Sequence, residues 1–148
     1  MIGAVRLRVA DVDRARAYYE RAIGLRELDR DGDVVRFGAD TPLVELVGDA
    51  DAPPRPPRAT GLFHFAILVP SRADLARAVQ RVVDAGARFT GASDHFVSEA
   101  LYLNDPEGNG IEIYRDRPRE EWPRDADGSI TMMTAPLDLR ALLRELDG

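Results

Sequence analysis

The sequence predicts an α+β fold in which one chain repeats the same order of elements twice: a strand, a helix and further strands. Each repeat has an apolar strand followed by a helix with an N-cap residue and a closing glycine. Each repeat also ends in an apolar strand that carries one glutamate. Two unrelated strand–helix–strand runs would give the same order, but the coinciding caps and glutamates favour a true repeat.

The first module is expected over residues 1–48. Its first strand, "VRLRV", alternates apolar residues with arginines, which is typical of a half-exposed strand. Asp11 is a candidate N-cap for the following helix, and Gly24 is placed to end that helix. Two short strand-like segments follow, "VVRFG" and "PLVELVG", and the second contains Glu45.

The second module is expected over residues 61–116. A strand predicted over residues 62–69 is followed by Ser71, a candidate N-cap, and then by an amphipathic helix that ends near a glycine. The segment "ALYLNDPEGNGIEIY" predicts two strands around a tight turn, in which Asn109 or Gly110 is free to adopt a positive φ.

The remaining segments connect and extend these modules into one domain. Residues 49–60 are rich in proline, which is excluded from the interior of helices and sheets, so an extended connector is expected. Residues 117–148 begin as a polar tail, and a short amphipathic helix is predicted over residues 137–146.

Composition excludes several classes of function. The net charge is −6 with mixed signs along the chain, so the basic stripe of a nucleic-acid-binding protein is absent. The sequence has no cysteine, which excludes disulfides, thiolate metal sites and cysteine nucleophiles. No apolar run reaches membrane length and the N-terminus lacks the layout of a signal peptide, so a cytoplasmic protein is expected.

Alignment of the two modules pairs residues of interest. Ala4 aligns with His64 in the first strands, and Glu45 aligns with Glu112 in the last strands. Glu112 lies between two isoleucines and therefore faces the opposite side of its strand. That side could be solvent, but a buried carboxylate needs a metal or another cation beside it. His64 on an apolar strand could likewise be a core histidine or a metal ligand.

These modules resemble the vicinal oxygen chelate superfamily, which contains glyoxalase I, fosfomycin-resistance and bleomycin-resistance proteins, and extradiol dioxygenases. The segments "GLFHFAILVPSRADLAR", "DHFVSEALYLNDPEGNGIEIYRDRPREEW" and "MTAPLDLRALL" are most similar to the N-terminal half of bacterial catechol 2,3-dioxygenases with four modules. The resemblance implies that two βαβββ modules form a half-open mixed β-barrel around a central pocket. In extradiol enzymes with four modules, the catalytic iron usually lies in the C-terminal half.

The resemblance implies a metal site on the first and last strands of a module. His64 and Glu112 would be two ligands, and His95 is the candidate third ligand, with Glu45 as a weaker alternative. Ala4 departs from the family pattern, because glyoxalases and fosfomycin-resistance proteins usually carry a histidine there. Extradiol cleavage requires divalent iron held by two imidazoles and one carboxylate, with an open face for substrate and oxygen. Fe(II) is therefore expected, with Mn(II) or Zn(II) as alternatives.

His95 and Tyr102 are the candidate catalytic residues, because they resemble a histidine and a tyrosine that act on the substrate in extradiol enzymes. Tyr102 lies ten residues before Glu112, as in that family, whereas the gap between His95 and Tyr102 is shorter than expected. A histidine there would transfer the catechol proton, since imidazole titrates near neutral pH. His95 could instead be a solvated loop residue.

The expected function is a metal-dependent, dioxygenase-like reaction, extradiol-type ring cleavage of a small catecholic substrate. One alternative is a non-catalytic small-molecule binding protein of the bleomycin-resistance type, and another is a glyoxalase-like lyase or isomerase. The expected partners are a small, aromatic substrate and a second copy of the chain in a homodimer, without nucleic acid or membrane.

Overall fold

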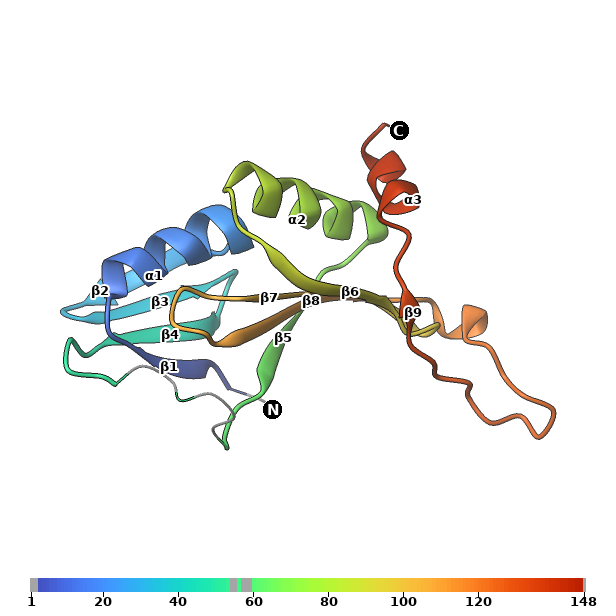
Figure 1. Cartoon of the computed structure of the whole chain (residues 1–148), viewed down its shortest axis with the longest axis horizontal. Helices are drawn as coiled ribbons and strands as arrows, with labels where there is room; N and C mark the ends of the chain where they lie inside the picture. Colours follow the sequence, from blue (N-terminus) through green and yellow to red (C-terminus); the bar gives the residue numbers. More distant parts are fainter. Residues whose placement is uncertain (1–2, 54–55, 57–59, 148) are drawn as a thin grey trace.

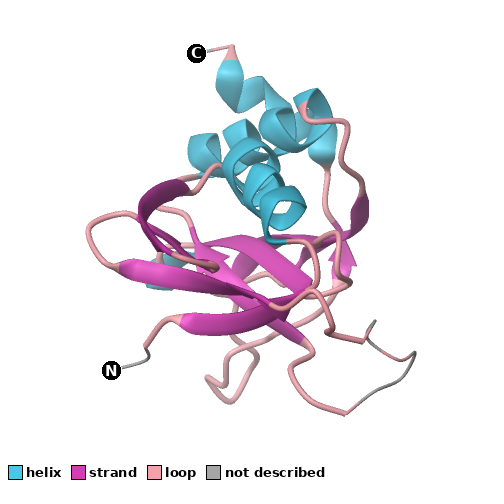
Figure 2. Ribbon diagram, turned by 90° about the vertical axis from the view of Figure 1, so that its left-hand side faces the viewer, coloured by secondary structure: helices cyan, strands magenta, loops and turns pink. Residues whose placement is uncertain are grey.

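The computed structural model describes residues 3–53, 56 and 60–147, and its helices form one layer over the strands (Figure 2). The predicted connector over residues 49–60 lies partly outside the described residues. The first module consists of β1 (Val5–Val9), α1 (Val12–Tyr18), a π-helical segment (Tyr19–Ile23), β2 (Arg26–Asp31), β3 (Val34–Gly38) and β4 (Pro42–Gly48). The second consists of β5 (His64–Leu68), α2 (Arg72–Asp84), β6 (Phe89–Asp94), β7 (Ser98–Asn104) and β8 (Gly110–Asp116).

The predicted helix caps are confirmed. The Asp11 side chain accepts a hydrogen bond from the Arg14 backbone N–H at 2.9 Å, and Gly24 ends the helical run with φ of 81°. Ser71 caps α2 in the same way, with its hydroxyl oxygen 3.1 Å from the Asp74 backbone N–H. These local bonds satisfy N–H groups that the first turn of a helix leaves free.

Each module forms its own sheet. The strand order is β1-β4-β3-β2 in the first and β5-β8-β7-β6-β9 in the second, where β9 (Ala135–Pro136) is a short strand of the tail. The first and last strands of each module pair in parallel, and the other pairs are antiparallel. Both sheets stay open, in agreement with the expected half-open arrangement.

The two helices cover the same side of both sheets (Figure 1). Tyr19 is central to the shared core, because its ring packs against Phe37 of the first module and Phe65 of the second. Its hydroxyl donates to the buried Asp105 carboxylate at 3.0 Å, which ties α1's extension to the turn between β7 and β8. The two modules therefore share one apolar core, and no helix of the described residues covers the opposite faces of the sheets.

The tail returns to the second sheet. After the polar stretch, β9 pairs with β6, and α3 (Leu139–Leu143) packs on α2 with Leu142 buried. A 3-10 turn (Arg144–Leu146) completes the helix predicted over residues 137–146. None of the helices in the described ranges is long and apolar enough to cross a membrane.

Two details differ from the expectations. In the turn after β7, the positive φ belongs to Gly108, at 85°, and not to Asn109 or Gly110. The reason is that the Asp105 carboxylate accepts two backbone N–H bonds inside the turn, which fixes the other residues. Strands β2 and β6 carried no alternating pattern, because both are mostly polar or small.

Candidate active site

The candidate site is built on one row of side chains across the helix-free face of the second sheet. Glu112 on β8 lies directly opposite Ala66 on β5 and Tyr102 on β7, and Tyr102 lies opposite Gly91 on β6. The neighbours of Glu112 along β8 are buried under the helices, so alternation turns Glu112 to the other side. Ala66 and Gly91 have small or no side chains, which leaves room on both flanks of the row.

Four predicted residues form a continuous hydrogen-bonded chain on this face. His64 Nε2 lies 2.8 Å from Glu112 Oε2, and the Tyr102 hydroxyl donates to Glu112 Oε1 at 3.1 Å. His95 Nε2 lies 3.0 Å from the same Tyr102 hydroxyl. The Glu112 side chain is only 14% exposed, so its buried carboxylate is held by two polar neighbours. The structure thus brings together residues that are 48 positions apart in the sequence.

Burial and the Glu112 charge determine the protonation of Tyr102. Burial, followed by the nearby Glu112 carboxylate, raises the pKa of Tyr102 to about 12. The phenol therefore keeps its proton at neutral pH and acts as a hydrogen-bond donor in the site.

The loop between β6 and β7 positions His95. Its backbone N–H donates to the Ser98 carbonyl at 2.9 Å, and Phe96 after it adopts φ of 72°, an unusual value for a non-glycine residue. Asp94 stabilises this conformation by accepting the Phe96 N–H at 2.8 Å and both terminal nitrogens of Arg117 at 2.6 and 2.8 Å. The Arg117 bonds also hold the pKa of Asp94 below its usual value.

The tail contacts the other side of the His95 ring. His95 Nδ1 lies 3.3 Å from the Met133 carbonyl oxygen and 3.2 Å from the Thr134 hydroxyl oxygen. Both ring nitrogens of His95 are therefore engaged, one by the sheet and one by the tail.

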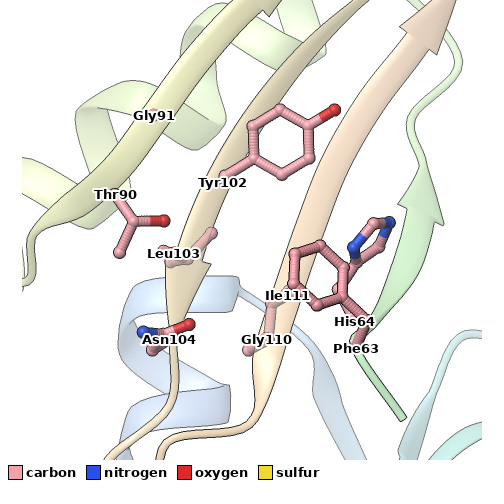
Figure 3. A pocket seen from close by; sticks show the side chains of 9 residues that line it. All are labelled: Phe63, His64, Thr90, Gly91, Tyr102, Leu103, Asn104, Gly110 and Ile111. Atoms are coloured by element: carbon pink, nitrogen blue, oxygen red, sulfur yellow. The ribbon is translucent and has the colours of Figure 1, made fainter. Parts of the chain in front are cut away.

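A pocket of about 360 Å³ lies beside this chain of side chains. Figure 3 shows the Tyr102 and His64 rings projecting from strands on either side of β8, with the Phe63 ring next to His64. Phe63 is 83% exposed and forms an apolar rim. The lining consists of Phe63, His64, Thr90, Gly91, Tyr102, Leu103, Asn104, Gly110 and Ile111.

In the first module, the side chains of the equivalent row are paired with one another in ion pairs. Glu45 lies opposite Arg6 and Arg36, and Arg36 lies opposite Asp29, in the same register as the second row. Glu45 binds Arg6 at 3.0 Å and Arg36 at 2.7 Å, and Arg36 also binds Asp29 at 2.6 Å. Ala4, which aligns with His64, offers no ligand atom on its side chain.

The sequence had singled out the four residues of this chain, but not the hydrogen bonds that join them or the residues around them. Thr134 was missed because the tail reaches His95 through a two-residue strand, which has no periodic pattern. Gly91 could have been identified from the sequence, since a lone glycine within a strand often marks a place where a ligand or another backbone approaches closely.

A family model described as "Glyoxalase/Bleomycin resistance protein/Dioxygenase superfamily" matches residues 1–113. The chain belongs to this superfamily. Its sequence is 42% identical over 148 residues to catechol-2,3-dioxygenase of Bacillus subtilis (strain 168), covering 97% of this chain and 51% of that protein. The chain therefore spans about half the length of this curated relative.

Solved structures agree with the superfamily fold. A glyoxalase/dioxygenase from Nostoc punctiforme superposes with a TM-score of 0.70 at 22% identity, covering 80% of this chain and 92% of that one. A lactoylglutathione lyase from Agrobacterium tumefaciens gives a TM-score of 0.58 at 24% identity, covering 78% of this chain and 92% of that one. At these identities the likeness establishes the fold.

The superfamily implies a divalent metal, and the types of donor present, an imidazole and a carboxylate, suit such an ion. The imidazole of His64 lines the pocket and lies 2.8 Å from the Glu112 carboxylate. The buried Nδ1 of His64 has no hydrogen-bond partner within the described part of the chain. The number of donors is smaller than two imidazoles and one carboxylate require. In the described ranges no three His, Asp or Glu residues gather closely enough to hold an ion.

The two candidates for the third ligand have other contacts. His95 is engaged by Tyr102 and by the tail, and Glu45 is engaged by two arginines. The structure thus places neither of them beside His64 and Glu112 as a ligand.

Proposed function

We propose that this chain is a metal-dependent vicinal oxygen chelate enzyme of the dioxygenase-like type, which acts on a small catecholic substrate by extradiol-type ring cleavage. The observation that carries the proposal is the polar chain from His95 through Tyr102 and Glu112 to His64 beside a pocket. The similarity to a catechol-2,3-dioxygenase supports the aromatic substrate. The fold alone would not select among reactions.

His64 and Glu112 would hold the divalent ion, Fe(II) before Mn(II) or Zn(II). Imidazole nitrogen and carboxylate oxygen are suitable donors for Fe(II). When bound, the ion would act as a Lewis acid toward two neighbouring oxygens of the substrate. His64 approaches Glu112 because β5 pairs with β8 in parallel, and Ala66 beside it leaves the carboxylate accessible.

Tyr102 and His95 would act on the substrate's protons. The Tyr102 hydroxyl stands beside Glu112 and lines the pocket, so it can donate to a substrate oxygen placed there. His95 lies one hydrogen bond behind Tyr102. Because imidazole titrates near neutral pH, this pair can pass a proton between the tail and the pocket. The volume of about 360 Å³ is in the range of pockets for small ligands.

The test is oxygen uptake by protein reconstituted with Fe(II) without oxygen and then mixed with a panel of catechols. We expect ring cleavage in the wild type and a loss of at least about 100-fold in kcat for Tyr102→Phe, within the range for a positioned proton donor. Tyr18→Phe is the matched control, because Tyr18 lies on α1, in the helical layer, and lines no part of this pocket. No oxygen uptake with any catechol would contradict the proposal.

A second candidate function is favoured by the number of metal donors. Only two donors converge among the described residues, which is also compatible with a small-molecule binding protein without chemistry. Calorimetry with the same catechols in the presence of a chelator separates the candidates. Binding that is unchanged by the chelator, together with absent oxygen uptake, would favour this second function.

A further inference from the structure

His95 lies between two partners whose hydrogen-bonding abilities differ. On the pocket side its Nε2 meets the Tyr102 hydroxyl at 3.0 Å. On the tail side its Nδ1 meets the Thr134 hydroxyl at 3.2 Å and the Met133 carbonyl at 3.3 Å. A neutral imidazole carries one proton, on either nitrogen, and these partners decide which nitrogen holds it.

The pocket side requires the proton on Nε2. Tyr102 has one hydroxyl proton, and Glu112, as a carboxylate, can only accept it. When Tyr102 donates to Glu112 at 3.1 Å, its oxygen is free to accept a bond from His95 Nε2–H. A bare Nε2 would instead compete with Glu112 for the same proton, and one acceptor would lose its bond.

Among the described residues, the tail side meets that requirement through Thr134. With the proton on Nε2, Nδ1 is a bare acceptor and needs a donor. The Met133 carbonyl cannot donate, whereas the Thr134 hydroxyl can. With the opposite tautomer, Nδ1–H would donate to the Met133 carbonyl, and Thr134 would not be needed.

We propose that Thr134 is a positioning residue that keeps neutral His95 protonated on Nε2. Every donor in the chain then points from the tail toward Glu112: Thr134 to His95, His95 to Tyr102, and Tyr102 to Glu112. The resting site is set to deliver a proton toward the pocket: Tyr102 would give up its hydroxyl proton and take the Nε2 proton of His95. His95 Nδ1 would take the hydroxyl proton of Thr134, which is exposed and would regain one from bulk water. Its role in the reaction rests on the proposed function, but the tautomer is a property of the chain without substrate.

The test is nitrogen NMR of protein labelled with ¹⁵N-histidine, at about pH 8.5, where an ordinary imidazole is neutral. The chain has two histidines, so a spectrum of His64→Gln assigns both. In the wild type we expect a bare Nδ1 and a protonated Nε2 for His95. Thr134→Val keeps the shape and removes the hydroxyl, and it should shift the tautomer ratio toward Nδ1–H by about two- to fivefold.

Thr134→Ser is the matched control, because it keeps the hydroxyl and should keep the wild-type tautomer. Thr134 lies on the exposed tail, and unchanged backbone amide spectra would verify that all variants are folded. A wild-type His95 protonated on Nδ1, or a ratio that is the same in Thr134→Val and Thr134→Ser, would overturn the proposal. Absent oxygen uptake would count against the proposed function only, since this readout needs no turnover.

Discussion

The two modules have the same glutamate at the same register position, and its neighbours decide what each glutamate can do. Glu45 stands between Arg6 and Arg36, which satisfy its charge with two ion pairs. Glu112 stands between Ala66 and Tyr102, with no arginine opposite it, and its carboxylate contacts the His64 imidazole and the Tyr102 hydroxyl. The residues opposite each glutamate therefore make Glu45 a structural carboxylate and leave Glu112 as a candidate metal ligand.

The adjacent tyrosines of α1 give a matched pair for a stability prediction. Tyr19→Phe removes the buried bond to Asp105, which keeps its other donors, so the free energy of unfolding should fall by about 1 kcal/mol. Tyr18→Phe removes a buried hydroxyl that has no partner among the described residues, so stability should stay the same or rise slightly. Urea denaturation of both variants measures this difference, and equal losses would contradict it.

Asp94 should contribute a pH-dependent term to stability. Its folded pKa is lowered by the Arg117 bonds, so its contribution is present above the unfolded pKa of about 3.9 and is lost as pH falls through the folded value. The wild type should therefore be more stable than Asp94→Asn at about pH 6, and the gap should narrow toward about pH 3. Denaturation at several pH values tests this, and a constant gap would be the contrary result.

Glu112 and His64 stood out in the sequence because each lies in a strong local pattern, whereas His95 and Tyr102 were named through the family resemblance. Glu112 interrupts an apolar strand, and His64 lies in the matching strand of the repeat. Their partnership with His95 depended on the loop after β6, whose conformation rests on the Asp94–Arg117 pair 23 residues apart. Local sequence carries no sign of such a distant contact.

At the scale of elements, the parallel pairing of β5 with β8 delivers His64 to Glu112. Gly110 makes that approach possible, because a Cβ there would lie 2.4 Å from the Phe63 carbonyl oxygen and 3.0 Å from the His64 Cβ. The backbone oxygen cannot move away from an added Cβ as the end of a flexible side chain could. The close approach of β5 to β8 therefore requires a glycine at position 110.

Gly110→Ala should displace β5 and destabilise the protein by about 2 kcal/mol, as overpacking does. Gly91→Ala is the control, because its Cβ would meet the Tyr102 ring at an ordinary 3.7 Å. Thermal denaturation compares the two variants, and the His64 ring signals in NMR report any displacement. A Gly110→Ala variant as stable as Gly91→Ala would argue against this close approach.

Element prediction followed the strength of the local pattern. The strands over residues 34–38 and 42–48 have the bounds seen in the sequence, and both long helices begin at the expected caps. Strands β2 and β6 belong to their sheets through their neighbours rather than through their own apolar residues: β2 pairs with β3, and β6 pairs with β7 and β9. Tertiary pairing overrides weak local preference in such strands.

At the scale of the whole molecule, α1 and α2 lie on one side of the sheets (Figure 1). Leu68 of β5 faces the opposite side, because it alternates with Phe65 and Ile67 of the core. Phe63 and Leu68 at the β5 edge are 83% and 55% exposed, and Met133 of the tail is 55% exposed. Exposed apolar groups of this kind are common at protein interfaces. A homodimer through this face is the expected assembly.

Analytical ultracentrifugation tests the expected dimer. The wild type should sediment as a dimer, and Phe63→Ser combined with Leu68→Ser should shift it toward the monomer, because apolar contact area is lost. Val83→Ser is the control, since Val83 is 58% exposed but lies on α2, in the helical layer. A monomeric wild type, or an equal shift in the control, would speak against the proposed face.

Whether His64 and Glu112 hold a metal ion is tested most directly by the iron content of protein that has been reconstituted with Fe(II) without oxygen and then desalted. We predict about one ion per chain in the wild type and in Glu45→Gln, and loss of the ion in both His64→Ala and Glu112→Ala. An ion retained by His64→Ala or Glu112→Ala, or a wild type that binds none, would contradict this prediction.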